Sequence, residues 1–372
     1  MSSTADSSSF PQSTEAGTGG GYEEFRRNLL PLNISTEYAD PSSDDLSSDW
    51  DSNEEPPPPS GVKPSGWRKV RNVVHWSPFV QTYKNHKYRW VQLAGHQGNF
   101  RAGEQGTILK KLCNREDTCL NNLMKDILKP FVPDYKGEVD TSDGKFVQLQ
   151  DLLADFENPC VMDIKMGVRT YLEEELAKAK EKTKLRKDMY EKMVQIDSNE
   201  PTEEEHKLKA ITKPRYMLWR ETISSTASLG FRIEGVKKSD GTSSKDFKTT
   251  KTKEQVSREI IKFTGGDPST IVSTSECYVT HGLKYTQKLI EIRDVLQKSS
   301  FFKDHELIGS SLLFVHDETC ANIWLIDFAK TLPVPEGLTV NHTSPWIVGN
   351  HEDGYLIGLE NLISIFSAIS NT

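Results

Sequence analysis

Residues 159–167 read Pro-Cys-Val-Met-Asp-Ile-Lys-Met-Gly and place one carboxylate and one ammonium in an otherwise apolar run. Successive side chains of a β-strand point to opposite faces. Asp163 and Lys165 would therefore share one face, and most of the apolar residues would lie on the other. Two opposite charges beside a buried strand are costly unless they pair or meet a ligand. The run predicts either a structural ion pair at a sheet edge or a site for a nucleotide and a phosphorylated substrate.

The spacing Pro-x-x-x-Asp-x-Lys-x-Gly resembles the signature of the inositol polyphosphate kinase family. Six further segments resemble that family in the same order, at residues 167–176, 184–190, 213–217, 230–235, 310–313 and 326–328. Together they are most similar to the inositol 1,4,5-trisphosphate 3-kinases of the family, from about Trp67 to the C-terminus. One departure is Ile347-Val348, where those relatives usually carry acidic residues. We expect this difference to affect a surface or regulatory contact rather than the chemistry.

The resemblance implies an α+β, two-lobed, kinase-like fold with a helical inositol-binding insertion. We expect five segments along the chain. They are a disordered acidic and Pro-rich tail (1–65), a basic amphipathic segment (66–87), an N-terminal lobe for the nucleotide (88–167), the helical inositol-phosphate-binding insertion (168–230) and a C-terminal lobe (231–372).

Composition restricts the function classes. The net charge of the 372 residues is −8, but residues 1–60 alone carry −10, which leaves the body of the chain at +2. A nearly neutral body without a recognisable nucleic-acid module argues against nucleic-acid binding. The five cysteines have no zinc-site spacing, so we expect reduced thiols in a cytoplasmic protein. No apolar run approaches the roughly 20 residues that span a bilayer, so no transmembrane segment is expected.

Residues 61–80 carry four basic residues and no acidic one. Trp67, Val70 and Val74 recur at i, i+3 and i+7, as on one face of a helix. This pattern suits either a helix packed on the first lobe or a calmodulin-binding segment. The resemblance favours the second reading, because regulation by calcium/calmodulin is typical of the trisphosphate 3-kinases.

Local patterns predict the elements. Strands are expected at 90–95, 106–110, 146–150 and 160–166, with a turn at 98–100 and a helix at 117–128. Residues 168–230 should be largely helical, with Thr202 as a helix cap. The last segment should contain strands at 231–235, 311–315 and 323–326 and helices at 255–263, 285–297 and 353–369.

Phosphoryl transfer requires positioning and positive charge around the transferring group. Lys110 ends a predicted strand behind the 98–100 turn, where it could reach the phosphates of ATP. Asp327 resembles the protein-kinase aspartate that holds Mg²⁺, although Ala329 replaces the usual glycine. The predicted ATP contacts are Asn99, Lys110, Gln150, Asp151, Leu152, Asp163, Lys237 and Asp327. The predicted Mg²⁺ contacts are Asp327 and Ser311.

The resemblance also implies the residues that bind the second substrate. Lys165 would lie near the reacting hydroxyl and, with Asp327, would carry catalysis; no general base is identified. The predicted substrate contacts are Lys165, Arg186, Lys187, Lys213, Tyr216, Arg220 and Lys330.

These observations predict an ATP-dependent kinase that phosphorylates inositol 1,4,5-trisphosphate at the 3-hydroxyl to give the 1,3,4,5-tetrakisphosphate. A broader inositol polyphosphate multikinase is one alternative, but the length of 168–230 favours the narrower enzyme. An inactive inositol-phosphate-binding scaffold is another, and the intact Lys110, Asp163, Lys165 and Asp327 argue against it. A protein kinase is disfavoured because no His-Arg-Asp catalytic loop appears.

Overall fold

The computed structural model describes residues 99–104, 106–181, 184–267 and 276–370. The predicted tail, the basic segment 66–87 and the strand expected at 90–95 all lie outside these residues. Within the described chain, no helix is both long and apolar enough to cross a membrane.

The N-terminal lobe is built on a four-stranded antiparallel sheet in the order β1-β2-β4-β3. Its elements are β1 (Phe100–Ala102), β2 (Thr107–Lys111), α3 (Asn114–Leu123), the 3₁₀ turn η1 (Lys129–Phe131), β3 (Tyr135–Thr141) and β4 (Gly144–Gln150). The strands predicted at 106–110 and 146–150 are confirmed. The helix predicted at 117–128 starts three residues earlier and ends at Leu123. β1 begins at Phe100, where the sequence predicts only a turn.

β3 has no counterpart among the predicted strands. It is an edge strand in which half-buried residues alternate with exposed charged ones, but none of its side chains is fully buried and only Tyr135 and Val139 are large and apolar, so the strand signal in its sequence is weak. It is paired to β4 through a tight hairpin at residues 141–144, where Gly144 has a φ of 122°. The partner strand, rather than its own composition, therefore defines β3.

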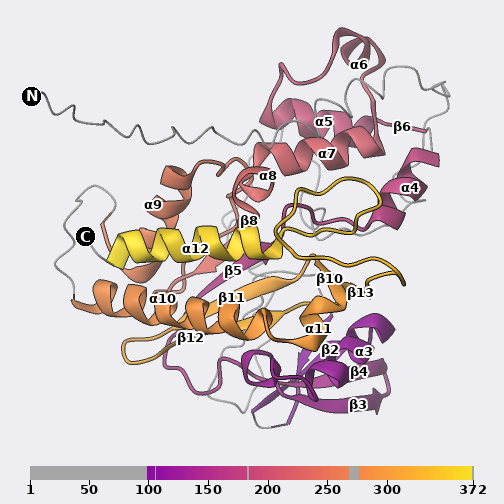
Figure 1. The fold of residues 1–372 in the computed structure, drawn as a ribbon. Coiled ribbons are helices and arrows are strands. Elements are labelled where there is room, and N and C mark those ends of the chain that lie inside the picture. Colours follow the sequence, from indigo (N-terminus) through magenta and orange to yellow (C-terminus); the bar gives the residue numbers. More distant parts are fainter. Residues whose placement is uncertain (1–98, 105, 182–183, 268–275, 371–372) are drawn as a thin grey trace, which may run out of the picture.

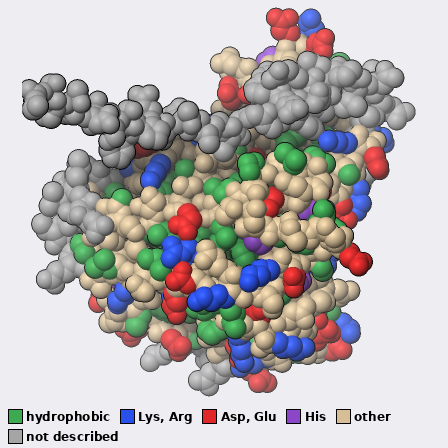
Figure 2. Space-filling view, in the orientation of Figure 1, with side chains coloured by type: hydrophobic (Ala, Val, Ile, Leu, Met, Phe, Trp, Pro, Cys, Tyr) green, Lys and Arg blue, Asp and Glu red, His purple; other side chains and the backbone are tan. Residues whose placement is uncertain are grey.

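The larger lobe is organised around a five-stranded antiparallel sheet in the order β12-β11-β5-β8-β9. These strands are β5 (Cys160–Met166), β8 (Phe231–Lys237), β9 (Ser243–Ser244), β11 (Ser311–His316) and β12 (Ala321–Ile326). Helices α9 (Lys253–Thr264), α10 (Glu276–Leu296) and α12 (Tyr355–Ser370) cover one face of this sheet (Figure 1). Figure 2 shows acidic and basic side chains interspersed over the surface on this side.

The covered face holds the main core. Met162, Ile164 and Met166 of β5 are fully buried there, together with Phe314 of β11 and Phe366 of α12. At one point α12 lies directly against the chain that enters β8. A Cβ atom on Gly358 would stand 2.1 Å from the carbonyl oxygen of Gly230. The helix therefore needs glycine there to approach so closely.

The segment between β5 and β8 forms a mostly helical insertion, which stands apart from the sheet at one end of the molecule (Figure 1). It contains α4 (Glu173–Glu181), β6 (Leu185–Arg186), α5 (Lys187–Ile196), α6 (Glu203–Leu208), β7 (Ile211–Thr212), α7 (Lys213–Ile223) and α8 (Thr226–Leu229). Thr202 caps α6 in a reciprocal capping box with Glu205, which confirms the predicted cap. The short β6–β7 ladder was not predicted; two residues per strand are too few to show a period.

The two lobes contact each other through three short elements of the larger lobe. These are α11 (Ser300–Lys303), β10 (His305–Ile308) and β13 (Lys330–Pro333). α3 packs on β13, and the Cys119 thiol lies 3.6 Å from the carbonyl oxygen of Thr331. The carboxylate of Asp126, in the smaller lobe, accepts hydrogen bonds from Ser299 and Ser300 and from the backbone of Phe301.

Candidate active site

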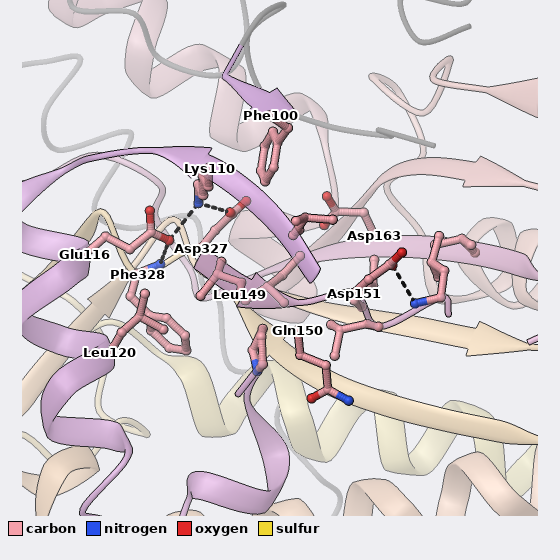
Figure 3. Close-up of a pocket in the computed structure, with 17 residues that line it drawn as sticks. Phe100, Lys110, Glu116, Leu120, Leu149, Gln150, Asp151, Asp163, Asp327 and Phe328 are labelled. Atoms are coloured by element: carbon pink, nitrogen blue, oxygen red, sulfur yellow. Dashed lines mark hydrogen bonds and ion pairs between the residues drawn. The ribbon is translucent and has the colours of Figure 1, made fainter. Parts of the chain in front are cut away.

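A cavity lies where the two lobes meet, between strands β1, β2 and β4 and the uncovered face of the larger sheet (Figure 3). Its walls are mainly apolar, and its polar groups are few. The lining residues are Phe100, Ile108, Lys110, Glu116, Leu120, Pro133, Leu149, Gln150, Asp151, Leu152, Leu153, Val161, Asp163, Leu313, Ile326, Asp327 and Phe328. A concave apolar site with a few convergent polar groups suits a flat base that carries a charged tail.

Six of the eight predicted ATP contacts line this cavity: Lys110, Gln150, Asp151, Leu152, Asp163 and Asp327. Asn99 immediately precedes Phe100, and its carbonyl oxygen accepts from the backbone of Lys111 at 2.6 Å, so it helps to pair β1 with β2. Lys237 ends β8, two residues beyond Gly235. Neither Asn99 nor Lys237 is among the described lining residues.

Lys110 is the centre of a three-residue ion cluster. Its Nζ lies 2.6 Å from Oε1 of Glu116 on α3 and 2.8 Å from Oδ1 of Asp327 after β12 (Figure 3). Glu116 also accepts from the backbone N–H of Phe328 at 3.2 Å. Burial disfavours the charged form of Lys110, but the two carboxylates outweigh it and raise the pKa of Lys110 above its ordinary value. The ammonium therefore stays charged at the mouth of the cavity.

Glu116 is the residue of this cluster that the sequence did not reveal. It is buried, although it lies in a helix of mixed polar composition. A lysine on a strand of the small lobe, paired with a glutamate on the adjacent helix, is also found in protein kinases. The available signal was the apolar spacing of α3, which places Glu116 on the same face as the buried Leu120 and Leu123.

Asp163 and Lys165 lie on one face of β5, as their spacing predicts. Asp163 is paired with Leu313 and Gly235, and Lys165 with Ser311 and Arg232. Both charged side chains are buried, and Asp163 alone lines the cavity. Burial raises the pKa of Asp163 to about 7; Lys165 opposes this shift, and Asp327 adds to it. A cation near Asp163 and Asp327 would lower the cost of ionising both carboxylates.

The residues near Asp327 fit a hard cation. Asp163 Oδ1 and Ser310 Oγ are buried and have no hydrogen-bond partner among the described residues, and the buried hydroxyl of Ser311 lies next to the Asp163 carboxylate. All three are oxygens, the donor type that Mg²⁺ prefers. The described residues contain no cluster of three or more acidic, histidine or cysteine side chains that could hold a metal alone. A magnesium ion here would complete its shell with phosphate oxygens and water, as is usual for this ion.

The insertion brings a second group of basic residues together. The β6–β7 ladder places Arg186 beside Ile211, so the N-termini of α5 and α7 lie close to each other. Lys187 and Lys213 are the first residues of these helices, at the positive ends of the helix dipoles, where an anionic ligand would be favoured. Arg186 itself pairs with Asp188 through two 2.8 Å hydrogen bonds. The geometry predicts an anionic ligand at these helix ends.

α7 connects that end of the insertion to β5. Lys213, Tyr216 and Arg220 recur at i, i+3 and i+7 and so share one face of α7. Burial lowers the pKa of Arg220; Tyr216 opposes this shift, and the nearby Arg232 of β8 adds to it. Arg232 is paired with Lys165 on β5. The basic face of α7 therefore extends from the N-termini of α5 and α7 to the charged face of β5.

Glu221 and Glu175 hold this region in place and were not predicted. Glu221 accepts from the backbone and hydroxyl of Thr170 and lies 3.6 Å from a nitrogen of Arg232. Glu175 lies 3.1 Å from Nζ of Lys330, the predicted substrate contact on β13. The structure therefore brings Lys165, Arg220 and Lys330 toward the junction of the insertion with the larger lobe. Arg186, Lys187 and Lys213 lie at the far end of α7.

Sequence comparisons identify relatives of this chain. The family model "Inositol polyphosphate kinase" matches residues 146–367. The chain is 56% identical over 305 residues to human inositol-trisphosphate 3-kinase B and covers 31% of that protein with 82% of its own length. It is 49% identical over 363 residues to mouse inositol-trisphosphate 3-kinase C, with 97% of this chain and 50% of that protein covered.

A crystal structure of the inositol phosphate multikinase from S. cerevisiae, solved with ADP and Mn²⁺, aligns with a TM-score of 0.46 at 18% identity. The alignment covers 70% of this chain and 98% of that one. On the family match and the relatives above, the chain belongs to the inositol polyphosphate kinase family. It spans only about a third to a half of the two named relatives.

Proposed function

We propose that this protein transfers the terminal phosphate of ATP to the 3-hydroxyl of inositol 1,4,5-trisphosphate. One observation carries the proposal. β5 directs Asp163 into an apolar cavity between the lobes and places Lys165, on the same face, in the row of Arg232 beside the basic insertion. A nucleotide and an anionic acceptor could therefore meet at a single strand. The relatives named inositol-trisphosphate 3-kinases support the choice of acceptor.

In the nucleotide half of the site, charged side chains held in fixed positions would bind the phosphates and the metal ion. The base would lie among the apolar residues near Gln150 and Leu152, and the phosphates would extend toward Lys110. Asp327, Asp163 and Ser311 would hold Mg²⁺, which when bound neutralises charge that develops on the transferring phosphate. Glu116 keeps Lys110 directed at this point, so little reorganisation would be needed during the reaction.

The acceptor half would use the insertion. Lys165 would lie next to the reacting hydroxyl, and Arg220 and Lys330 would bind phosphates near the junction. Arg186, Lys187, Lys213 and Tyr216 would reach a phosphate at the helix ends. Arginine and lysine paired with phosphate form charge-assisted hydrogen bonds, each of which contributes about 1.5–3 kcal/mol. A loose transition state depends only weakly on a general base, and none is assigned.

The long insertion favours a dedicated trisphosphate kinase over a multikinase, and the charged cluster disfavours an inactive scaffold. The deciding experiment incubates the chain with radiolabelled ATP and inositol 1,4,5-trisphosphate and separates the products by chromatography. One tetrakisphosphate product, absent with Lys165→Met, supports the proposal. Several higher phosphates would identify a multikinase instead, and trisphosphate binding without turnover would identify a scaffold.

We also propose that calcium/calmodulin stimulates the activity through the basic segment 66–87, which lies outside the described residues. The same assay, run with and without calcium–calmodulin, tests this point. Trp67→Ala should reduce the stimulation and leave the basal rate unchanged, because the change is distant in sequence from every proposed site residue. Stimulation that is equal in both proteins would place the calmodulin contact elsewhere.

A further inference from the structure

Lys245 extends one of the residue rows that cross the uncovered face of the larger sheet. In the row that contains Asp163, Trp324 of β12 is followed by Leu313, Asp163 and Gly235. The β8–β9 pairing joins Lys237 to Ser243 and Val236 to Ser244. β9 ends at Ser244, and Lys245 is the next residue. Continued by one residue, the antiparallel register would bring Lys245 opposite Gly235, in the same row as Asp163 with only a glycine between them.

Successive side chains alternate between the two faces of the sheet, and this alternation places Lys245 on the same uncovered face as Asp163. Val236 is buried in the core below the sheet, so its partner Ser244 belongs to that covered face. The next residue, Lys245, then belongs to the uncovered face, and it is exposed. Because Gly235 has no side chain, nothing on β8 stands in this row between the lysine and the carboxylate.

A β-bulge changes the neighbouring position. The pairing of β5 with β8 shifts between Asp163 and Ile164, so that Glu234 is the extra residue of β8. Glu234 forms a hydrogen bond of 2.6 Å with Nε of Arg232 and so is held toward the substrate side. The carboxylates of Asp163 and Glu234 both act electrostatically on the Lys245 ammonium. Among the described residues, Lys245 makes no hydrogen bond or ion pair.

We propose that Lys245 is a further phosphate contact of the bound nucleoside triphosphate, on the flank opposite Lys110. The inference rests on the proposed nucleotide cavity. Lys110 approaches the phosphates from the small lobe, and its charge is already shared by Glu116 and Asp327. Lys245 approaches from the β8–β9 edge, level with Asp163. A flexible lysine that reaches across a glycine suits the polyphosphate chain, which lies beyond the apolar part of the cavity.

The row in which Lys245 lies also indicates which of the two reactants it would contact. The row on the acceptor side runs through Ser311, Lys165 and Arg232. On β5 it lies two residues beyond the row of Asp163. Lys245 lies in the other row, with Asp163, and Asp163 is the member of the pair that lines the nucleotide cavity. Loss of Lys245 should therefore weaken nucleotide binding and leave the affinity for the inositol phosphate unchanged.

The test is calorimetric titration of the full chain with ATP, ADP and AMP in the presence of Mg²⁺ and without inositol phosphate. Lys245→Gln should weaken ATP binding about tenfold and AMP binding less than twofold, because the contact is to the outer phosphates. Lys245→Arg should keep ATP affinity within about threefold. Lys248→Gln is the matched control, since it removes the same charge from an exposed position of the same loop.

Unchanged ATP affinity in Lys245→Gln would overturn the inference, and so would equal losses for ATP and AMP, which indicate a structural role. An increased KM for inositol 1,4,5-trisphosphate with unchanged ATP binding would also overturn it. The titration needs no turnover, so it separates the two proposals. A wild-type chain that binds ATP and makes no tetrakisphosphate would contradict the proposed function and still allow Lys245 to be judged.

Discussion

Asp327 adopts a φ of 65°, a left-handed conformation that a non-glycine residue seldom takes. The residue directly follows β12, and its side chain reaches back to Lys110. Such strain persists only where the surroundings hold it, and it gathers at functional sites. Here Lys110 pairs with the Asp327 carboxylate, and Glu116 accepts from the N–H of the next residue, Phe328, so Asp327 is held through its side chain and through the residue that follows it.

Glu116 should therefore be a positioning residue for Lys110. Glu116→Gln keeps the size of the side chain but removes one of the two carboxylates that hold the ammonium. We expect kcat to fall about 10- to 100-fold, with a smaller change in KM for ATP, because preorganised charge acts mainly on the transition state. Steady-state kinetics measure this. Asp117→Asn is the control, since that carboxylate faces Tyr135; a Glu116→Gln enzyme within twofold of wild type would refute the role.

His316 should make the larger lobe sensitive to acid. Burial, with a smaller effect from His281, lowers the pKa of His316 to about 3, and its Nδ1 lies 2.9 Å from the Tyr285 hydroxyl. The unfolded chain takes up this proton near pH 6.5, so it binds more protons than the folded protein between about pH 6.5 and 3. The contribution of neutral His316 to the free energy of unfolding is therefore complete above pH 6.5. It decreases as the pH falls, by about 2 kcal/mol at pH 5.

His316→Asn should flatten this pH dependence, even if the variant is less stable at pH 8. Urea unfolding between pH 5 and 8 gives the slope. His206→Asn, which changes an exposed histidine, should leave the slope as in wild type. If His316→Asn also keeps the wild-type slope, other groups such as His281 or Asp317 carry the acid response.

At this scale the sequence predicted the charged residues of the site but not their partners. Asp163 and Lys165 stand out because charge is costly beside an apolar strand, whereas Lys110 and Asp327 were predicted from their resemblance to kinase residues. Glu116, Glu175 and Glu221 lie in helices rich in other charges, where a buried carboxylate has no distinct local signature. Their burial depends on elements that are distant in the chain.

At the scale of elements, the contact of α12 with the chain entering β8 leaves no room for a side chain at Gly358. Gly358→Ala would place its new methyl group against backbone atoms of Gly230, which cannot move without displacing the strand. We expect a loss of about 1–3 kcal/mol or more in unfolding free energy. Thermal and urea unfolding measure it.

Gly282→Ala on α10 is the matched control for that change. Its new methyl would meet only the side chain of Ser370, whose hydroxyl can rotate away. Alanine also favours helix over glycine by about 1 kcal/mol, so this variant should be as stable as wild type or more so. Equal effects of the two substitutions would mean that the α12 contact is looser than described.

The elements that carry a strong period were predicted from the sequence. β5, β11, β12 and the long helices are confirmed because each buries an apolar face. β3 and the β6–β7 ladder were missed because their pairing depends on partner strands and not on their own hydrophobicity. The expected boundaries of five segments along the chain remain a prediction.

At the scale of the whole molecule, Asp126 is a link between the lobes. Its carboxylate accepts from the Leu128 backbone in its own lobe and from Ser299, Ser300 and Phe301 in the other. Burial opposes ionisation of Asp126. The hydrogen bonds that its carboxylate accepts, from Ser299 first, outweigh burial and lower the pKa of Asp126. The stabilisation is thus present above pH 4 and lost as the pH falls through the lowered value.

Asp126→Ala should cost about 1–3 kcal/mol and expose the backbone on both sides of the link. Hydrogen exchange should quicken at residues 126–131 and in α11 together. Ser300→Ala, which removes one exposed contact, should change stability by less than about 1 kcal/mol and leave exchange at 126–131 unchanged. Faster exchange in only one of the two regions would show that the lobes are held elsewhere.

β5 fixes the distance between the two charges of the 159–167 run. Asp163 and Lys165 are two residues apart on one extended strand, so their Cα atoms lie about 6.5–7 Å apart. If the nucleotide and the acceptor bind as proposed, a movement of the small lobe could change how tightly the nucleotide is held, but it could not change this spacing. The separation of the two reactants would then be set by the covalent geometry of one strand.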